Sequence, residues 1–326
     1  MIRYFSKSFI SRYLILLLLL TLCCLPTMID SESFFDFPNE TLSIGSHTSN
    51  VLNIFFTVFL PVLLAASVFA LNMIAVKQGF TGMISTLTMF LYLLFLSSFS
   101  NYFSANKLIL ISFVLILLLQ SIMTFHERDD SIKNALNAGI YVGFASVFYP
   151  PAIFMIAIIW FGILLHRVNN WRPFIASLLG VLSNYMLLFS WYFITDRWEE
   201  EGIFYYHSIV PTFDWNIQNN ITEVVVMILL LIIGLAISFK IVTILGEKSI
   251  NLRRNLLLLV IAFFLITGIS IVFNDLSFFA VAGIPVSLMA AHIFSTARHT
   301  LWTNRFLMVV TTVVIISHLF RLYHAV

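Results

Sequence analysis

Carboxylates gather in two short segments of a chain that otherwise carries few charges. The first segment, residues 29–50, contains no Lys or Arg. A carboxylate can deprotonate a hydroxyl group or bind a divalent cation, so this segment is a candidate source of a general base. Its candidate catalytic residues are Asp30, Glu32 and Asp36.

The second acidic segment, residues 196–220, combines carboxylates with aromatic residues. Aromatic rings can stack on a sugar, and they also gather at the boundary between lipid headgroups and hydrocarbon. Loops on the outer side of a membrane are acidic in any case, because Lys and Arg are retained on the inner side. The candidate substrate-binding residues of this segment are Trp198, Tyr205 and Tyr206.

Other kinds of site lack a recognisable pattern. The eight histidines are scattered, with no pair at helical ligand spacing inside one apolar run, which disfavours haem or zinc. No phosphate-binding loop, dinucleotide fingerprint or nucleophile elbow is present. The 17 Lys and Arg are dispersed and the net charge is only +2, so we expect no nucleic-acid partner. We therefore predict no metal and no cofactor.

The elements that position these residues must lie in a membrane. The chain has 326 residues, of which 60% are apolar and 10% charged, whereas a soluble domain has about a quarter charged residues. This composition excludes a water-soluble fold and predicts an all-α, polytopic transmembrane helical bundle of about 10–11 membrane segments. We expect one integral membrane domain over residues 1–326. With 34 Phe and only 12 Gly, the composition favours lipid-facing helices over small-residue seams.

The run from Asn134 to Leu165 decides the topology. It is too long for one span of about 20 residues and too short for two. Pro150 and Pro151 lack N–H groups and disfavour helix in the residue before them, so we expect a short helix pair; one kinked crossing is the alternative. With the pair, only three of the 17 basic residues lie outside: Lys107, Arg197 and Arg321. This positive-inside pattern predicts a cytoplasmic N-terminus and an external C-terminus.

Several stretches resemble a family of uncharacterised polytopic inner-membrane proteins of Bacteroidota. They are LNMIAVKQGFTG at 71–82, FYPPAIF at 148–154, NWRPF at 170–174 and NLRRN at 251–255. The helix pair around a proline break is also similar, in architecture, to GT-C membrane glycosyltransferases that use polyprenyl-phosphate sugars. That resemblance implies a base in the first outer loop, at Asp30, Glu32 or Asp36, with the lipid phosphate near Arg172.

Three functions are compatible with these patterns. The first is an inner-membrane enzyme of envelope glycan or lipid-linked sugar metabolism, with membrane lipid and a polyprenyl-phosphate-linked sugar as partners. The second is a non-enzymatic membrane subunit of an envelope assembly or secretion complex, bound to other envelope membrane proteins. The third is a transporter or lipid flippase, in which the broken segment lines a cavity. Whether the protein is an enzyme stays open at this point.

Overall fold

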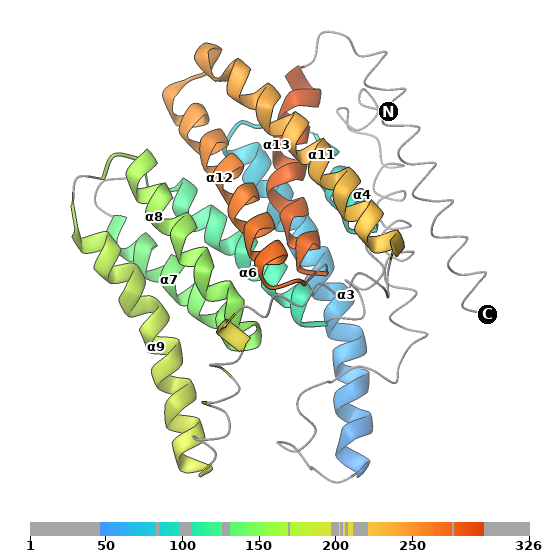
Figure 1. Cartoon of the computed structure of the whole chain (residues 1–326), viewed down its shortest axis with the longest axis vertical. Helices are drawn as coiled ribbons and strands as arrows, with labels where there is room; N and C mark the ends of the chain where they lie inside the picture. Colours follow the sequence, from blue (N-terminus) through green and yellow to red (C-terminus); the bar gives the residue numbers. More distant parts are fainter. Residues whose placement is uncertain are drawn as a thin grey trace. The chain divides into compact units, whose positions relative to one another are not determined.

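The computed structural model of the chain consists of helices throughout its described part (Figure 1). The described residues are 46–82, 85–97, 106–125, 131–168, 170–196, 202, 205, 208–210, 221–275 and 277–296. No strand occurs among them, so the expected all-α class is confirmed. Two compact units divide this part of the chain. One contains the described residues up to Ile109 and from Ala290 onward, and the other is Leu110–Met289.

The first unit contains α3 (Ser46–Lys77), α4 (Leu87–Ser97), the start of α6 (Asn106–Met123) and the end of α13 (Gly283–Thr296). Helix α3 ends at Gly79, whose φ of 71° is a left-handed conformation that glycine adopts without strain. The chain then turns back, and the Phe80 carbonyl accepts a hydrogen bond from Ser295 Oγ at 3.1 Å. His292 Nδ1 lies 3.0 Å from the same carbonyl oxygen. The stretch at 71–82 is therefore a helix ending whose turn is held by α13.

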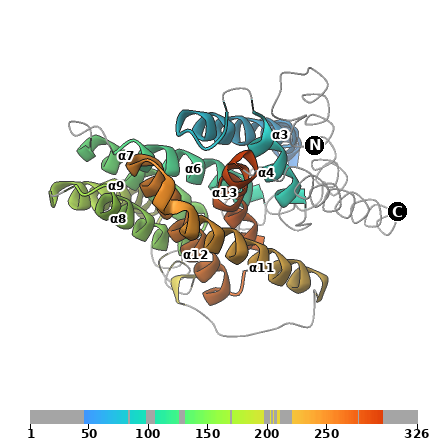
Figure 2. The same cartoon turned by 90° about the horizontal axis from the view of Figure 1, so that it is seen from above.

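The second unit contains the remaining elements. Their bounds are α7 (Ser131–Phe148), η3 (Pro150–Met155), α8 (Ile156–Leu165), α9 (Arg172–Ile194), α11 (Ile221–Ile244), η5 (Leu245–Glu247), α12 (Ile250–Val272) and η6 (Ser277–Ala282). The rest of α6 and the start of α13 complete it. Helices α7, α8 and α9 lie side by side in both views (Figures 1 and 2).

Helices α7 and α8 form an antiparallel pair broken at the two prolines. The start of α7 contacts the end of α6, where Ser121 Oγ donates to the Asn134 carbonyl at 2.8 Å. The end of α8 contacts that same end of α6, since the rings of Phe125 and His166 have centroids 6.1 Å apart. Because both contacts occur at one end of the unit, the chain must go out and return between them. The short pair is confirmed, and the alternative of a single kinked crossing is wrong.

Helices α7 and α9 run parallel and pack through small residues. Gly139 lies against the Ser177 backbone, and Gly180 lies against the backbone of Leu136 and Ile140. Asn184 Nδ2 donates to the Ile140 carbonyl at 3.1 Å, so this polar residue links two helices. The composition favoured lipid-facing helices over small-residue seams, yet this helix pair contains such a seam. Three glycines, Gly139, Gly143 and Gly180, lie where the two helices approach closely.

Four helical segments of the described chain are long and apolar enough to cross a membrane: Arg172–Ile194, Leu230–Glu247, Ile250–Val272 and Ser277–Thr296. Shorter apolar helices cover Pro61–Lys77, Leu87–Leu96, Lys107–Met123 and Pro150–Leu165. In α9 only 22% of the apolar window is buried, compared with 61% in α12. Apolar side chains thus cover the outside of α9, as they do on helices that face lipid. The chain is a membrane-embedded helical protein.

Candidate site at the break between α7 and α8

The break between α7 and α8 is a corner whose backbone geometry follows from its two prolines. Tyr149 is extended, with φ −143° and ψ 94°, as expected for a residue that precedes proline. The Ala152 N–H then donates to the Tyr149 carbonyl at 2.8 Å and starts the 3-10 helix η3. In an uninterrupted helix the Val147 carbonyl would accept from the N–H of residue 151, but Pro151 has none. The corner therefore contains a carbonyl that needs another donor.

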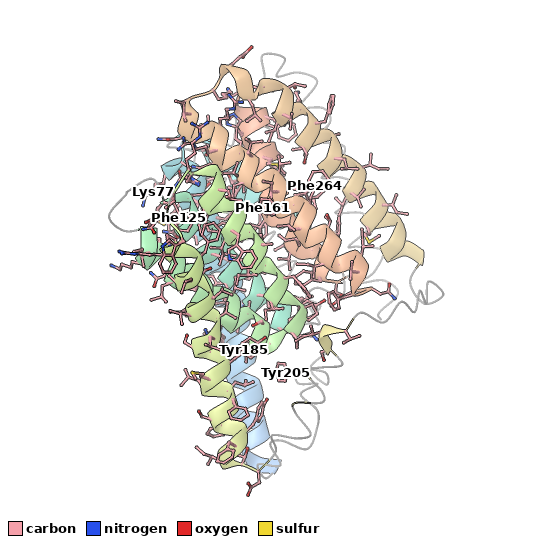
Figure 3. The ribbon with its side chains drawn as sticks, turned by 60° about the vertical axis from the view of Figure 1, so that its left-hand side comes forward. Lys77, Phe125, Phe161, Tyr185, Tyr205 and Phe264 are labelled. Atoms are coloured by element: carbon pink, nitrogen blue, oxygen red, sulfur yellow. The ribbon has the colours of Figure 1, made fainter. Side chains whose placement is uncertain are left out.

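Tyr205 supplies that donor. Its hydroxyl donates to the Val147 carbonyl at 2.8 Å, across 58 positions of sequence. The Tyr205 ring also lies edge-on to the ring of Tyr185 in α9, with centroids 6.5 Å apart, and the two side chains are adjacent in Figure 3. The segment that follows α9 is thereby attached to the corner. This contact gives Tyr205 a structural role that its sequence context did not indicate.

Tyr149 and Asp275 form the other side of the corner. The Tyr149 ring stacks on Phe278 of η6 with centroids 4.6 Å apart, and only 7% of Tyr149 is exposed. Burial, and secondarily the neighbouring Asp275 carboxylate, raises the pKa of the Tyr149 hydroxyl above its usual range. This tyrosine therefore stays protonated and does not act as a base.

Asp275 holds the start of η6. Its Oδ1 accepts from the N–H groups of Ser277 at 3.1 Å and Phe278 at 3.2 Å. Its own carbonyl accepts from Ser270 Oγ at 2.7 Å. One carboxylate oxygen is thus committed to capping, as at a helix N-terminus. The half-buried groups that the corner offers to a ligand are the rings of Tyr185 and Tyr205 and the Asp275 carboxylate, whereas Tyr149 and Phe278 are buried. These groups suit binding of a polar ring better than proton abstraction by Asp275.

Among the described residues, the candidate site residues predicted from the sequence do not come together in one site. The candidate bases Asp30, Glu32 and Asp36, and the aromatic residues Trp198 and Tyr206, lie outside the described residues. Arg172 is exposed at the first position of α9, where its N–H donates to Asn170 Oδ1 at 3.2 Å. Tyr185, the neighbour of Tyr205, is 13 positions further along α9, which corresponds to about 20 Å. Arg172 and Tyr205 therefore cannot contact the same small group.

Tyr149 and Asp275 are the corner residues that sequence reasoning did not nominate. The signal for Tyr149 was its place before two prolines, which forces an extended residue at the break. Asp275 lies in the turn FNDLS, where an Asp followed by a helical turn is typical of a capping residue. Among the described residues, no three His, Cys, Asp or Glu side chains lie together as a metal site would require.

Comparison with known proteins gives one match. A family model described as a family of unknown function (DUF6427) matches residues 7–326, almost the whole chain. The chain belongs to DUF6427. No curated protein and no solved structure matches it. The expected membership in an uncharacterised family is thus confirmed.

Replacing Tyr205 by phenylalanine tests the corner of this DUF6427 protein. The change keeps the ring but removes the donor to Val147, and a buried carbonyl left without a partner costs about 1–2 kcal/mol. We expect the free energy of unfolding, measured by SDS titration and circular dichroism, to fall by that amount. Tyr141→Phe is the matched control, because no hydrogen bond of the half-buried Tyr141 hydroxyl is present in the described chain. Equal losses in the two variants would contradict the assigned role.

Proposed function

We propose that the protein is a multi-pass protein of the bacterial inner membrane that takes a polyprenyl-phosphate-linked sugar from the bilayer and acts on it at the outer face during envelope-glycan assembly. The observation that carries the proposal is the corner between α7 and α8. The buried stack of Tyr149 on Phe278 belongs to this corner. There the half-buried rings of Tyr185 and Tyr205 lie edge-on to each other, at the end of the apolar helices where Asp275 caps η6. A sugar attached to a lipid needs such a surface at the membrane boundary.

The distribution of charge supports the orientation that this function requires. The starts of α7, α9 and α12 and the end of α8 lie at one end of the second unit, together with Lys133, Arg167, Arg172, Arg253 and Arg254. The corner lies at the opposite end, where the described ionisable side chains of the neighbouring turns are Asp196 and Asp275. By the positive-inside rule, the basic end is cytoplasmic and the corner is external. We propose about eleven membrane segments, a cytoplasmic N-terminus and an external C-terminus.

In this mechanism the carboxylates of residues 29–50 supply the base. One of Asp30, Glu32 and Asp36 removes the proton from the acceptor hydroxyl while the sugar is held against aromatic side chains of the second outer segment. The acceptor oxygen then bonds to the anomeric carbon of the sugar as the bond from that carbon to the phosphate oxygen breaks, and polyprenyl phosphate leaves. Tyr205 supports this arrangement, because its bond to Val147 attaches that segment to the corner. Trp198 and Tyr206, which belong to the same segment of the sequence, are proposed to contact the sugar. Loss of the base would leave the donor bound and unreacted.

The test is to extract the lipids that co-purify with the protein in mild detergent and to quantify polyprenyl-phosphate sugars by mass spectrometry. We expect enrichment over an unrelated membrane protein purified in parallel. The triple variant Asp30→Asn, Glu32→Gln, Asp36→Asn should retain several-fold more of the donor, because binding persists while transfer stops. Absence of enrichment in both the wild-type protein and the triple variant, relative to the unrelated membrane protein, would contradict the proposal. A reporter fused after Val326 tests the orientation separately, and a cytoplasmic signal would overturn it.

The non-enzymatic subunit is the second candidate, and helix α9 favours it. Beyond Val181 no residue of α9 is buried, and Leu187, Trp191 and Ile194 are among its most exposed side chains. This aromatic half-helix offers a surface on which another membrane protein could pack. Loss of a co-purifying partner after deletion of residues 199–215 would favour this function. The transporter has no comparable support, because the Val147 carbonyl freed by the break already accepts from Tyr205.

A further inference from the structure

The basic end of the second unit contains an interhelical clamp built on His166. The His166 Nδ1 lies 2.8 Å from the Gly162 carbonyl of its own helix, and a carbonyl can only accept, so Nδ1 donates. The other ring nitrogen lies 3.2 Å from the Asn255 side chain of α12. Only 3% of Asn255 is exposed. The clamp therefore fixes the end of α8 against the start of α12, across 89 positions of sequence.

Two arginines follow directly from this clamp. Arg167 is the sequence neighbour of His166, and Arg254 is the neighbour of Asn255. The bond between His166 and Asn255 consequently brings together the two distant chain segments that carry Arg167 and Arg254. Arg253 belongs to the same helical turn, but it is two residues from Asn255 and therefore projects from the opposite side of α12, at 100° per residue. Arg172 adds an exposed charge at the start of α9, beside the exposed Arg167 and the half-buried Arg254.

Arg167 occupies a backbone conformation that favours glycine. Its φ is 54°, and the N–H groups of Arg167 and Val168 donate to the Leu164 and Ile163 carbonyls, which is the usual helix ending with glycine at the left-handed position. An L-residue there costs about 1–2 kcal/mol of strain. A cation near a helix C-terminus recovers part of that cost. The strain also directs the arginine side chain out of the helix at its end, where it is exposed.

These guanidinium groups have no acceptor among the described residues. Neither the side chain of Arg167 nor that of Arg254 takes part in a hydrogen bond or ion pair there, and the same is true of Arg172. Guanidinium groups at the end of apolar helices are suited to bidentate bonds with phosphate oxygens. The clamp thus joins two segments that each carry a guanidinium group with no acceptor among the described residues.

Apolar side chains lie directly beside this charge. On α8, Phe161 and Leu164 are exposed, by 42% and 63%. Trp171, next to Arg172, is 68% exposed, as is typical of tryptophan at a membrane boundary. A free phosphate would use only the charges, whereas a lipid would use the charges and the apolar surface together. The combination therefore favours an amphiphile.

We propose that Arg167 and Arg254 bind the phosphate of an anionic phospholipid, whose acyl chains lie along Phe161 and Leu164. Arg172 contributes charge at the edge of the site, and the clamp between His166 and Asn255 positions the two principal arginines. The site lies at the opposite end of the unit from the corner, and it does not depend on the function proposed for that corner. Its occupant is a membrane lipid and not a substrate.

The experiment measures thermal unfolding of the full chain in detergent during titration with short-chain lipids. Dioctanoyl phosphatidylglycerol should raise the midpoint of unfolding, and dioctanoyl phosphatidylcholine and sodium phosphate should not. In the Arg167→Gln, Arg254→Gln variant, about tenfold more of the anionic lipid should be needed for the same shift, as expected for loss of charge-assisted bonds. Mass spectrometry of co-purified lipid should show a parallel loss of phosphatidylglycerol.

The matched control removes the same charge from the same end of the unit. In Arg253→Gln, Lys240→Gln the two replaced side chains are both exposed and lie on α12 and α11. This control should need less than about twofold more lipid, since the Arg167 and Arg254 pair is intact. Equal weakening in both variants would show general attraction to basic residues and overturn the site. Stabilisation by sodium phosphate as strong as by the lipid would overturn the lipid as occupant. If the double variant Arg167→Gln, Arg254→Gln needed no more phosphatidylglycerol than the wild-type protein for the same shift, the proposed site would also be refuted.

Discussion

Gly139→Leu is expected to destabilise the protein by about 3 kcal/mol, because side-chain atoms would have to enter a space already filled by backbone. A Cβ at position 139 would collide with the Ser177 carbonyl group of α9. The facing Gly180 is equally tight, since a Cβ there would lie 2.7 Å from the Ile140 backbone nitrogen. Backbone cannot move aside as a flexible side chain can. The two helices must then separate, and the bond from Asn184 to Ile140 is lost with them.

The measurement is the free energy of unfolding in SDS titration, with yield of folded protein as a second readout. Gly268→Leu is the matched control, because Gly268 is also a glycine inside an apolar helix, yet a Cβ there meets no atom within 4 Å. We expect the control to be neutral or slightly stabilising, since leucine favours helix more than glycine does. Comparable losses at positions 139 and 268 would show that the seam between α7 and α9 is not tightly packed.

Phe278→Ala should be the second severe change, with a loss of about 2–4 kcal/mol. The Phe278 side chain is completely buried and stacks on Tyr149 at the corner. Its removal leaves a cavity and also frees Tyr149, so contacts on both sides of the proline break are weakened. The same unfolding assay measures the loss. A blue shift of the tyrosine absorption toward that of solvent-exposed tyrosine would report the opening of the corner.

Phe264→Ala is the control for this prediction. Phe264 lies in α12, within the same unit, and 50% of its surface is exposed. Lipid or detergent can replace most of the contacts that alanine gives up, so we expect a loss below about 1 kcal/mol. If Phe264→Ala proved as costly as Phe278→Ala, burial of the ring would not be the reason for the effect at position 278.

The corner and the basic end give the second unit two chemically different ends. Tyrosines and Asp275 surround the turn from α7 to α8, whereas arginines surround the turn from α8 to α9. The short hairpin makes this possible, because it lets α7 and α9 run parallel while α8 returns between their ends. A single crossing over the same residues would have placed Arg167 and Arg172 at the end of the unit opposite to the start of α7.

The amino-acid sequence by itself determined the helical membrane class and the position of the break. Both follow from local properties: apolar runs must form helices in hydrocarbon, and two prolines remove two consecutive N–H donors wherever they occur. The sorting of basic residues to one end was predictable for the same reason, since each helix reversal moves the next turn to the other end. These features need no knowledge of which helices are neighbours.

Only the tertiary structure decided which residues meet. Three contacting pairs are far apart in the sequence: Val147 and Tyr205 by 58 positions, His166 and Asn255 by 89, and Gly139 and Ser177 by 38. No local pattern relates the two members of any pair. The low glycine content favoured lipid-facing helices over small-residue seams, yet three of the twelve glycines lie on the facing sides of α7 and α9. Pairing in a membrane depends on close fit and on satisfying polar groups, and both are properties of two surfaces together. A single chain segment cannot reveal them.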